Sequence, residues 1–259
     1  MSIIYCGKPN KNPYYIKEAD LNIRSIEELA YFIYNYAILI SNSFITKNLI
    51  VYIDKVLGLS KLASEVNDLY NKKGNLANVL THILISSGFY DDDEISQFRI
   101  RLLKLLSLPE DEYIHRAGDK LFKLKKYEKA IAQYSKIAKT SNTALKRLAF
   151  CYAKLQFYDT AADYLGKLYR RTKNVDDLKE AYFALKLNGT VDKIYEYESD
   201  IDEELLADWE LDIVTRIIMV RKSDELKNIE STFLMGQNDI KENISNRIRI
   251  WKDKYRYIG

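Results

Sequence analysis

The stretch of sequence that decides the fold is GDKLFKLKKYEKAIAQYSKI, which runs from Gly118 to Ile137. Its pattern recurs 31 residues later, where AFCYAKLQFYDTAADYLGKL occupies 149–168. The small residues Gly118 and Ala130 match alanines in the second copy, and the tyrosine at Tyr127 is repeated too. Two antiparallel helices come close together only where their side chains are small at the crossing. Each copy therefore predicts a pair of antiparallel helices with the tyrosine at the turn.

Proline and glycine usage extends the helical interpretation to most of the chain. The chain has three prolines and nine glycines, and no proline follows Pro109. Proline interrupts helices because it lacks the amide donor and clashes with the preceding turn. Apolar residues recur at helical spacing from Ile95 to Leu106 and from Ile244 to Ile258. We therefore predict an all-α fold of about a dozen helices, each of roughly 10 to 20 residues.

Three positions carry signals for the start of a helix. Ser25 is followed by Glu28 in a capping-box pattern, and Asp91 opens an acidic run that suits the positive end of a helix dipole. Pro109 stands where one helix ends and the next begins.

Only the beginning of the chain reads as extended. The segments 3–5 (IIY) and 14–16 (YYI) predict a short hairpin or an extended arm, and 21–23 (LNI) is a candidate further strand. The predicted organisation has four parts, in chain order: an extended or β-hairpin arm at 1–24, an N-terminal helical region at 25–108, helical repeats at 109–200, and C-terminal helices that continue the stack at 201–259.

The repeated pattern resembles the tetratricopeptide repeat (TPR). The resemblance covers 114–169, where the quoted stretch is similar to the end of the family's first helix, its turn and its second helix. A weaker third unit at 178–197 keeps Ala181 but has Lys193 where the family has a small residue. The offset of 31 residues is also shorter than the family's 34. The resemblance implies an α-α superhelix, and two helical hairpins of a non-repeat domain are the alternative. Residues 1–110 carry no family resemblance.

Composition places the chain among ordinary globular proteins. Its 259 residues are 47% hydrophobic and 30% charged, and 40 basic against 37 acidic residues leave a net charge of +3. This balance excludes disordered, collagen-like and disulfide-rich chains, and it gives no electrostatic argument for a nucleic-acid partner. Cys6 and Cys151 form no metal or redox motif, which predicts reduced thiols. The uncharged stretch 29–46 contains Asn35 and predicts a buried core helix, not a membrane span. We expect a cytoplasmic protein without a secretion signal or a membrane partner.

The sequence contains none of the familiar motifs for catalysis or cofactor binding. It has no glycine-rich nucleotide loop, no nucleophile elbow and no HExxH motif. The acidic run from Asp91 lacks the glycine of a calcium loop, so a helix start is the better interpretation. His82 and His115 have no titratable partner at a recognisable spacing. We therefore expect no catalytic residue, no metal and no cofactor.

The resemblance also implies where a partner binds. In the family, the first helix of each unit lines the concave face of the superhelix. Its outward positions carry over to the following residues: His115, Arg116 and Asp119 in the first unit, Lys146, Arg147 and Phe150 in the second, and Lys179 and Tyr182 in the third. These cations and rings suit an acidic or aromatic peptide, since arginine pairs with carboxylates and rings supply rigid contact area. The prediction is a non-catalytic scaffold for a protein or peptide. Alternatively, neighbouring helices cover this face.

The competing function is nucleic-acid binding. Basic and aromatic residues interleave near the C-terminus, in the set Arg247, Arg249, Trp251, Lys252, Lys254, Tyr255, Arg256 and Tyr257. Such a mixture holds single strands by stacking and phosphate attraction. However, Ile244, Ile248, Trp251 and Tyr255 share one helix face, which favours a terminal helix that docks on the body. A second basic cluster surrounds the first repeat turn: Lys120, Lys123, Lys125, Lys126 and Lys129.

Overall fold

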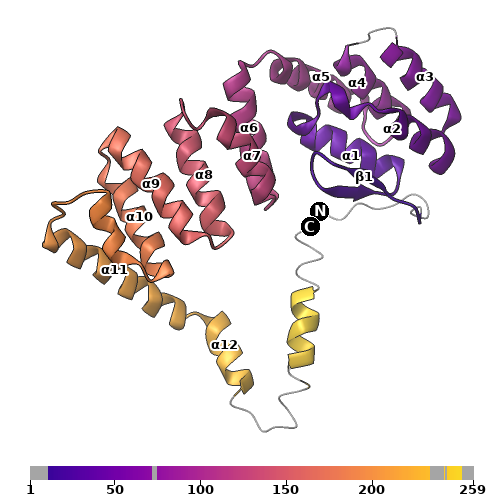
Figure 1. Cartoon of the computed structure of the whole chain (residues 1–259). Coiled ribbons are helices and arrows are strands. Elements are labelled where there is room, and N and C mark those ends of the chain that lie inside the picture. The colour runs from indigo at the N-terminus through magenta and orange to yellow at the C-terminus, as the bar shows by residue number, and fades with distance from the viewer. Residues whose placement is uncertain (1–10, 72–74, 234–241, 243, 253–259) are drawn as a thin grey trace.

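The computed structural model describes residues 11–71, 75–233, 242 and 244–252 (Figure 1). Within these residues the fold is all-α, with one two-stranded sheet near the start. Successive helices pack against one another in pairs. Each helix in the described part of the chain is too short or too polar to cross a lipid bilayer.

The elements before the repeats are β1 (Tyr14–Ile16), β2 (Leu21–Ile23), α1 (Ile26–Tyr36), the 3-10 turns η1 (Ala37–Leu39) and η2 (Asn42–Phe44), α2 (Lys47–Val51), the π-helical turn η3 (Tyr52–Val56), α3 (Ser60–Asn71), α4 (Leu76–Ser87) and α5 (Asp92–Leu106). The remaining elements are α6 (Glu110–Lys123), α7 (Tyr127–Ile137), α8 (Asn142–Lys154), α9 (Tyr158–Thr172), α10 (Val175–Asn188), the 3-10 helix η4 (Val191–Glu196), α11 (Glu203–Arg221) and α12 (Asp224–Phe233). Helix also covers 244–252.

The two strands form an antiparallel hairpin that packs on the body of the protein. Ile16 pairs with Leu21, and the inward side chains of Ile16 and Ile23 are buried in the core. The carboxylate of Asp20, in the hairpin turn, lies 2.8 Å from the ammonium group of Lys126, which follows α6. The candidate strand at 21–23 is therefore confirmed, and the one at 3–5 lies outside the described residues.

The N-terminal helical region is a small bundle around α4, which packs against α1, α3 and α5. The helix starts predicted at Ser25 and Asp91 are confirmed. The side chain of Asp91 accepts the amide of Glu94 at 2.8 Å, and the carboxylate of Glu94 accepts the amide of Asp91 at 3.0 Å, which completes a capping box. Ser25 likewise accepts the amide of Glu28. The helices α1, α3 and α5 surround a central helix, so this region differs from the linear array that follows.

From α6 to α10, each helix packs on the one before it (Figure 1). The turns after α6 and α8 are alike. Lys125 and Gln156, 31 residues apart, both have left-handed backbone conformation, with φ of 59° and 66°. The flanking backbone hydrogen bonds repeat too: Lys126 donates to the carbonyl of Leu121, and Phe157 donates to that of Tyr152. The backbone conformation of the turn therefore recurs with the same offset of 31 residues as the sequence pattern.

Gly118 permits a close approach between α6 and α7. A Cβ atom at this position would lie 2.6 Å from the ring of Tyr134, well inside contact distance. Tyr134 follows Ala130 by one helical turn, and both are fully buried. The predicted small-residue crossing therefore exists, and the group that fills it is an aromatic ring.

The second helix that the resemblance implies for a third unit is not present after α10. After α10, the chain forms only the short η4, in which Lys193 pairs with the carboxylates of Asp159 and Asp163 on α9, each at 2.9 Å. The ring of Tyr197 packs over Gly166, where a Cβ atom would lie 2.6 Å from it. A lysine is tolerated at 193 because its ammonium group reaches two acids of α9 and does not lie in a helix crossing.

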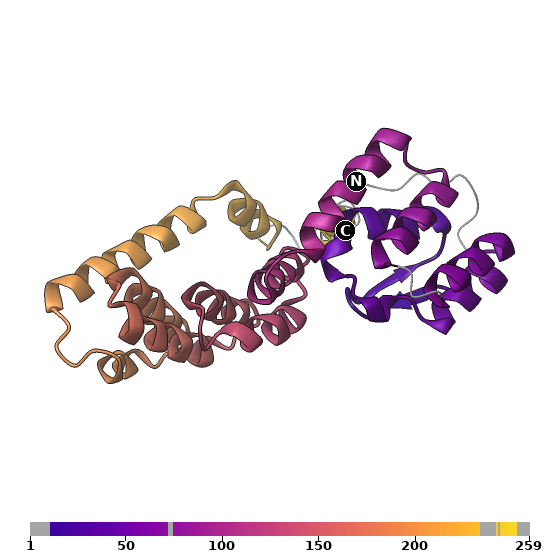
Figure 2. The same ribbon diagram turned by 90° about the horizontal axis from the view of Figure 1, so that it is seen from above.

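Helix α11 changes its surroundings half-way along its length. Trp209 in its first half is only 3% exposed and packs against Tyr182 of α10, with ring centroids 5.5 Å apart. In Figure 2 its second half lies away from the array, and in both views α12 continues from it (Figures 1 and 2). Ile248 and Trp251, which were predicted to dock on the body of the protein, are exposed among the described residues, so the predicted docking is not seen there. Tyr255 lies outside the described residues.

Candidate functional site

Each cation of the predicted partner-binding strip is paired with a carboxylate of the same chain. The ion pairs are Arg116 with Glu112 (2.6 Å), Arg147 with Asp119 (3.4 Å), Lys146 with Asp177 (2.8 Å) and Glu180 (3.1 Å), and Lys179 with Asp212 (2.9 Å). The four cations of the strip are therefore ion-paired within the chain. The charge of the strip is largely compensated by acids from α6, α10 and α11, of which only Asp119 belongs to the predicted strip.

The carboxylate of Asp119 contacts two other predicted residues, His115 and Arg147, and also Tyr134. It accepts a hydrogen bond from the hydroxyl of Tyr134 at 2.6 Å, and it lies 3.3 Å from Nδ1 of His115 and 3.4 Å from Nε of Arg147. Burial and the hydrogen bond to Asp119 raise the pKa of Tyr134. Nε2 of His115 is buried without a hydrogen-bond partner among the described residues. These contacts tie α6 to α7 and α8, so Asp119 and Arg147 hold the array together.

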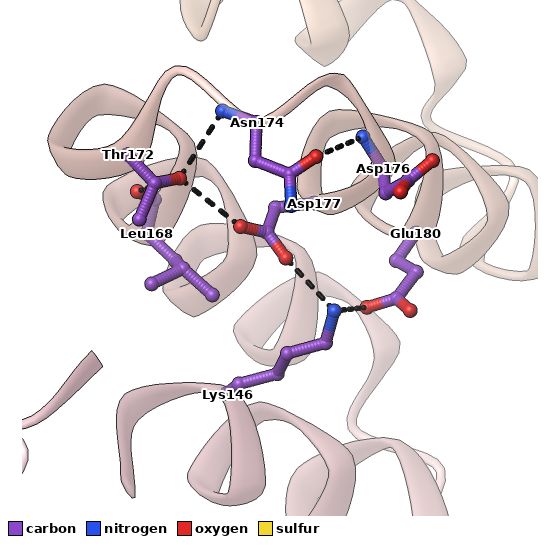
Figure 3. A network of polar contacts seen from close by, with 7 residues as sticks. All are labelled: Lys146, Leu168, Thr172, Asn174, Asp176, Asp177 and Glu180. Atoms are coloured by element: carbon purple, nitrogen blue, oxygen red, sulfur yellow. Dashed lines mark hydrogen bonds and ion pairs between the residues drawn. The ribbon is translucent and has the colours of Figure 1, made fainter. Parts of the chain in front are cut away.

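Lys146 belongs to a polar network that joins three helices (Figure 3). Its ammonium group donates to the buried carboxylate of Asp177 at 2.8 Å, and the hydroxyl of Thr172 lies 3.1 Å from the other oxygen of that carboxylate. Burial lowers the pKa of Lys146, but hydrogen bonds to Asp177 and Glu180 outweigh it and leave the pKa raised. Phe150 is half-buried, with the ammonium group of Lys146 over its ring at 5.8 Å.

The first half of α11 covers the end of the predicted strip. Tyr182 is only 4% exposed, and its hydroxyl donates to the carboxylate of Glu210. The expectation that Tyr182 offers an accessible ring is therefore wrong. Burial and the bond to Glu210 raise its pKa. The ammonium group of Lys179 is held between the carboxylate of Asp212 and the ring of Phe183. At this end of the predicted strip, α11 therefore contacts α10.

Two predicted residues, Arg116 and Asp119, line a cavity of about 400 Å³ where the array meets the N-terminal bundle. The other lining residues are Tyr34, Asn35, Ala37, Ile38, Phe98, Arg101, Leu102, Leu105, Lys120 and Lys123. Lys120 and Lys123 belong to the basic cluster predicted around the first repeat turn, whereas Arg101 and the apolar floor were not predicted from the sequence. A signal was present, because Arg101 lies between Phe98 and Leu105 at helical spacing.

The cavity carries uncompensated positive charge. Among the described residues, no carboxylate lies within ion-pair distance of Arg101, Lys120 or Lys123. The guanidinium group of Arg101 stacks 4.6 Å from the ring of Tyr34, and the ammonium group of Lys120 lies 4.3 Å from the ring of Tyr36. Burial, and then the charge of Lys123, lower the pKa of Lys120. An anion that binds beside Lys120 would stabilise the charged form of this lysine.

A second surface that sequence analysis missed is the apolar second half of α11. We define this α11 face by its exposed members: Leu211, Val214, Ile217, Ile218, Met219 and Val220. Leu211 and Met219 are 64% and 66% exposed. Large apolar patches on a protein surface mark interaction sites, because their contact with water is unfavourable.

Neither a metal site nor a reactive thiol is found in the described part of the chain. No group of three or more His, Cys, Asp or Glu side chains is arranged to hold a metal ion there. Cys151 is a free, buried cysteine, and burial raises the pKa of its thiol to about 12. Comparisons of the chain with models of protein families, with curated proteins and with solved structures give no match.

Proposed function

We propose that this chain is a non-catalytic scaffold of TPR-like superhelical construction that binds another polypeptide. The repeat offset supports this architecture, since the turns after α6 and α8 share a left-handed residue and equivalent backbone hydrogen bonds. Arrays of this kind present extended surfaces to partners without needing catalytic groups. A cytoplasmic location is part of the same proposal.

The observation that carries the proposal is the α11 face. Leu211, Ile217 and Val220 are exposed on different sides of one helix. Apolar side chains on several sides of one helix are normally buried, and the described part of this chain does not cover them. A partner polypeptide that packs on this face would remove the apolar area from water, at about 25 cal/mol per Å² of apolar surface buried.

The test compares two isoleucine-to-glutamate variants of the tagged full chain. Ile217→Glu places a charge in the α11 face, and Ile85→Glu makes the same change at an exposed isoleucine of α4. Proteins captured from extracts of the native cells are quantified by mass spectrometry. The proposal expects the captured partner to fall by about tenfold or more with Ile217→Glu and to stay unchanged with Ile85→Glu. Equal capture by both variants would contradict it.

The second candidate function is binding of single-stranded nucleic acid. Trp251 is 47% exposed on the same short helix as the exposed basic residues Arg249 and Lys252 and the half-buried Arg247. Stacking on the indole and phosphate contacts would both be available there. Affinity for an oligonucleotide, measured over a salt series, separates the two candidates, because phosphate contacts weaken steeply as the salt concentration rises.

A further inference from the structure

We propose that the cavity between α1, α5 and α6 anchors the partner by binding one acidic residue together with an apolar residue next to it. This inference rests on the proposed function and adds the chemistry of the bound segment. It concerns a different surface from the α11 face, so the two can fail separately.

The charge of the cavity wall selects an acidic group. Arg101 comes from α5, while Lys120 and Lys123 come from α6, and all three lack a carboxylate partner among the described residues. Like charges gathered without counter-charges repel one another, and a carboxylate bound between them removes this repulsion. Arg101 also offers a planar pair of donors, which matches the two oxygens of a carboxylate.

The one acid in the wall does not fill this role. Asp119 accepts the hydroxyl of Tyr134 and lies next to His115 and Arg147, so its charge is already compensated on the side of α7 and α8. Arg116 is compensated by Glu112. The cations left for a ligand are therefore Arg101, Lys120 and Lys123.

The floor of the cavity selects an apolar neighbour for that acid. It is formed by Ile38, Phe98, Leu102 and Leu105, with the ring of Tyr34 beside them. A cavity of about 400 Å³ lies at the small end of the range for ligand pockets. It has room for a few side chains, and an entire helix of about 10 Å diameter is too wide for it. An acidic residue next to a leucine or phenylalanine in an extended segment matches both the wall and the floor.

The test measures binding of short blocked peptides to the full chain by isothermal titration calorimetry. The probe is N-acetyl-Glu-Leu-Glu-Phe-amide. One control peptide replaces both glutamates by glutamine, and the other replaces the leucine and phenylalanine by serine. Inorganic phosphate is titrated separately, to detect a site that binds any small anion. We expect the probe to bind at least about tenfold more tightly than either control peptide or phosphate.

Matched variants then locate the site. Arg101→Gln combined with Lys123→Gln removes two cavity charges and should weaken the probe by about tenfold or more. Arg99→Gln combined with Lys104→Gln removes the same charges from exposed positions of α5 outside the cavity, and should change the affinity less than about twofold. Arg101→Lys with Lys123→Arg keeps both charges and should retain most of the binding.

Several results would overturn the inference. The first is that the probe does not bind. The second is that the serine peptide or phosphate binds as tightly as the probe. The third is that Arg99→Gln with Lys104→Gln weakens the probe as much as Arg101→Gln with Lys123→Gln. If the probe fails to bind while Ile217→Glu still abolishes partner capture, the inference about the cavity is wrong and the proposed function stands. If Ile217→Glu has no effect on capture, the proposed function fails whatever the peptide does.

Discussion

Helices α8 and α11 are both rich in apolar residues, but only α8 is covered along its length. Helix α8 lies between α7 and α9 and buries Leu145, Leu148 and Cys151 in the core. Helix α11 buries Trp209 in its first half, whereas Leu211 and the rest of the α11 face remain exposed. A helix rich in apolar residues therefore serves two different purposes in this protein. In α8 the apolar side chains stabilise the array, and in the second half of α11 they are available to a partner.

The same contrast applies to the charged residues. Within the array, Lys146, Arg147 and Lys193 are paired with acids of neighbouring helices. In the cavity at the start of the array, Arg101 and Lys123 have no such partner among the described residues. Charged residues of the array therefore specify how its helices pack, and those of the cavity are free to bind a ligand.

The largest expected contrast is between two leucine-to-alanine substitutions. Leu148 on α8 is 1% exposed, so Leu148→Ala leaves a cavity and should lower the free energy of unfolding by about 3 kcal/mol. Leu211→Ala on α11 should lower it by less than about 0.5 kcal/mol. Urea denaturation followed by circular dichroism measures both. Similar losses for the two variants would mean that α11 is covered in the free protein.

The polar network of Figure 3 gives the next contrast. Asp177→Ala removes a buried carboxylate that accepts from Lys146 and from Thr172, and should lower the free energy of unfolding by about 2 kcal/mol. Asp176→Ala is the matched control, because Asp176 lies in the same first turn of α10 but is exposed. It should cost about 0.5 kcal/mol. Chemical denaturation of the two variants side by side tests this, and equal losses would contradict a specific role for the network.

A smaller effect, with a diagnostic sign, is expected at Gly118. Alanine is favoured over glycine inside a helix by about 1 kcal/mol, so an unobstructed Gly118→Ala would stabilise the protein. The added methyl group would meet the ring of Tyr134 at 2.6 Å, so we expect a net destabilisation of about 1 kcal/mol. Adding Tyr134→Leu to Gly118→Ala should remove this penalty relative to Tyr134→Leu alone. A stabilising Gly118→Ala, seen in thermal or urea unfolding, would refute the close approach of α6 and α7.

The smallest effect concerns the contact between α10 and α11. Hydrogen bonds from Arg216 and from Lys179 lower the pKa of Asp212 to about 2. Because this folded-state pKa lies below the ordinary value, the contribution of Asp212 to stability is present above pH 4 and is lost as the pH falls towards 2. A carbon-detected NMR titration should show this low midpoint, and Lys179→Gln, which removes the partner of Asp212 on α10, should raise it. No rise of the midpoint with Lys179→Gln would mean that α11 does not pack on α10 in solution.

Local features of this fold were predictable from sequence, and contacts between distant segments were not. The capping box at Asp91, the helix start at Pro109 and the pairing of helices at Gly118 depend on neighbouring residues or on one repeat offset. The burial of Tyr182 depends on Trp209 and Glu210 of α11. The position of α11 against α10 cannot be predicted from a local sequence pattern. The pairing of Lys146 with Asp177 likewise joins two helices through the fold.

The cavity was missed for the same physical reason. Its wall combines Tyr34, Arg101 and Lys120, which come from three separate helices. Each of these residues is unremarkable in its own segment, and only the packing of the N-terminal bundle on α6 brings them together. The α11 face was missed because an apolar helix predicts burial, and sequence alone does not say whether the same chain supplies the cover.

The most direct test of the central claim, that the second half of α11 binds a partner polypeptide, is photocrosslinking in the native cells. The photoreactive amino acid benzoylphenylalanine replaces Ile217 in one variant and Ile85, the exposed isoleucine of α4, in the other. After irradiation, the adducts are separated by size and the attached chains are identified by mass spectrometry. We predict a discrete adduct with a second polypeptide from position 217 and none from position 85. No adduct at 217, or the same adduct from both positions, would contradict the account.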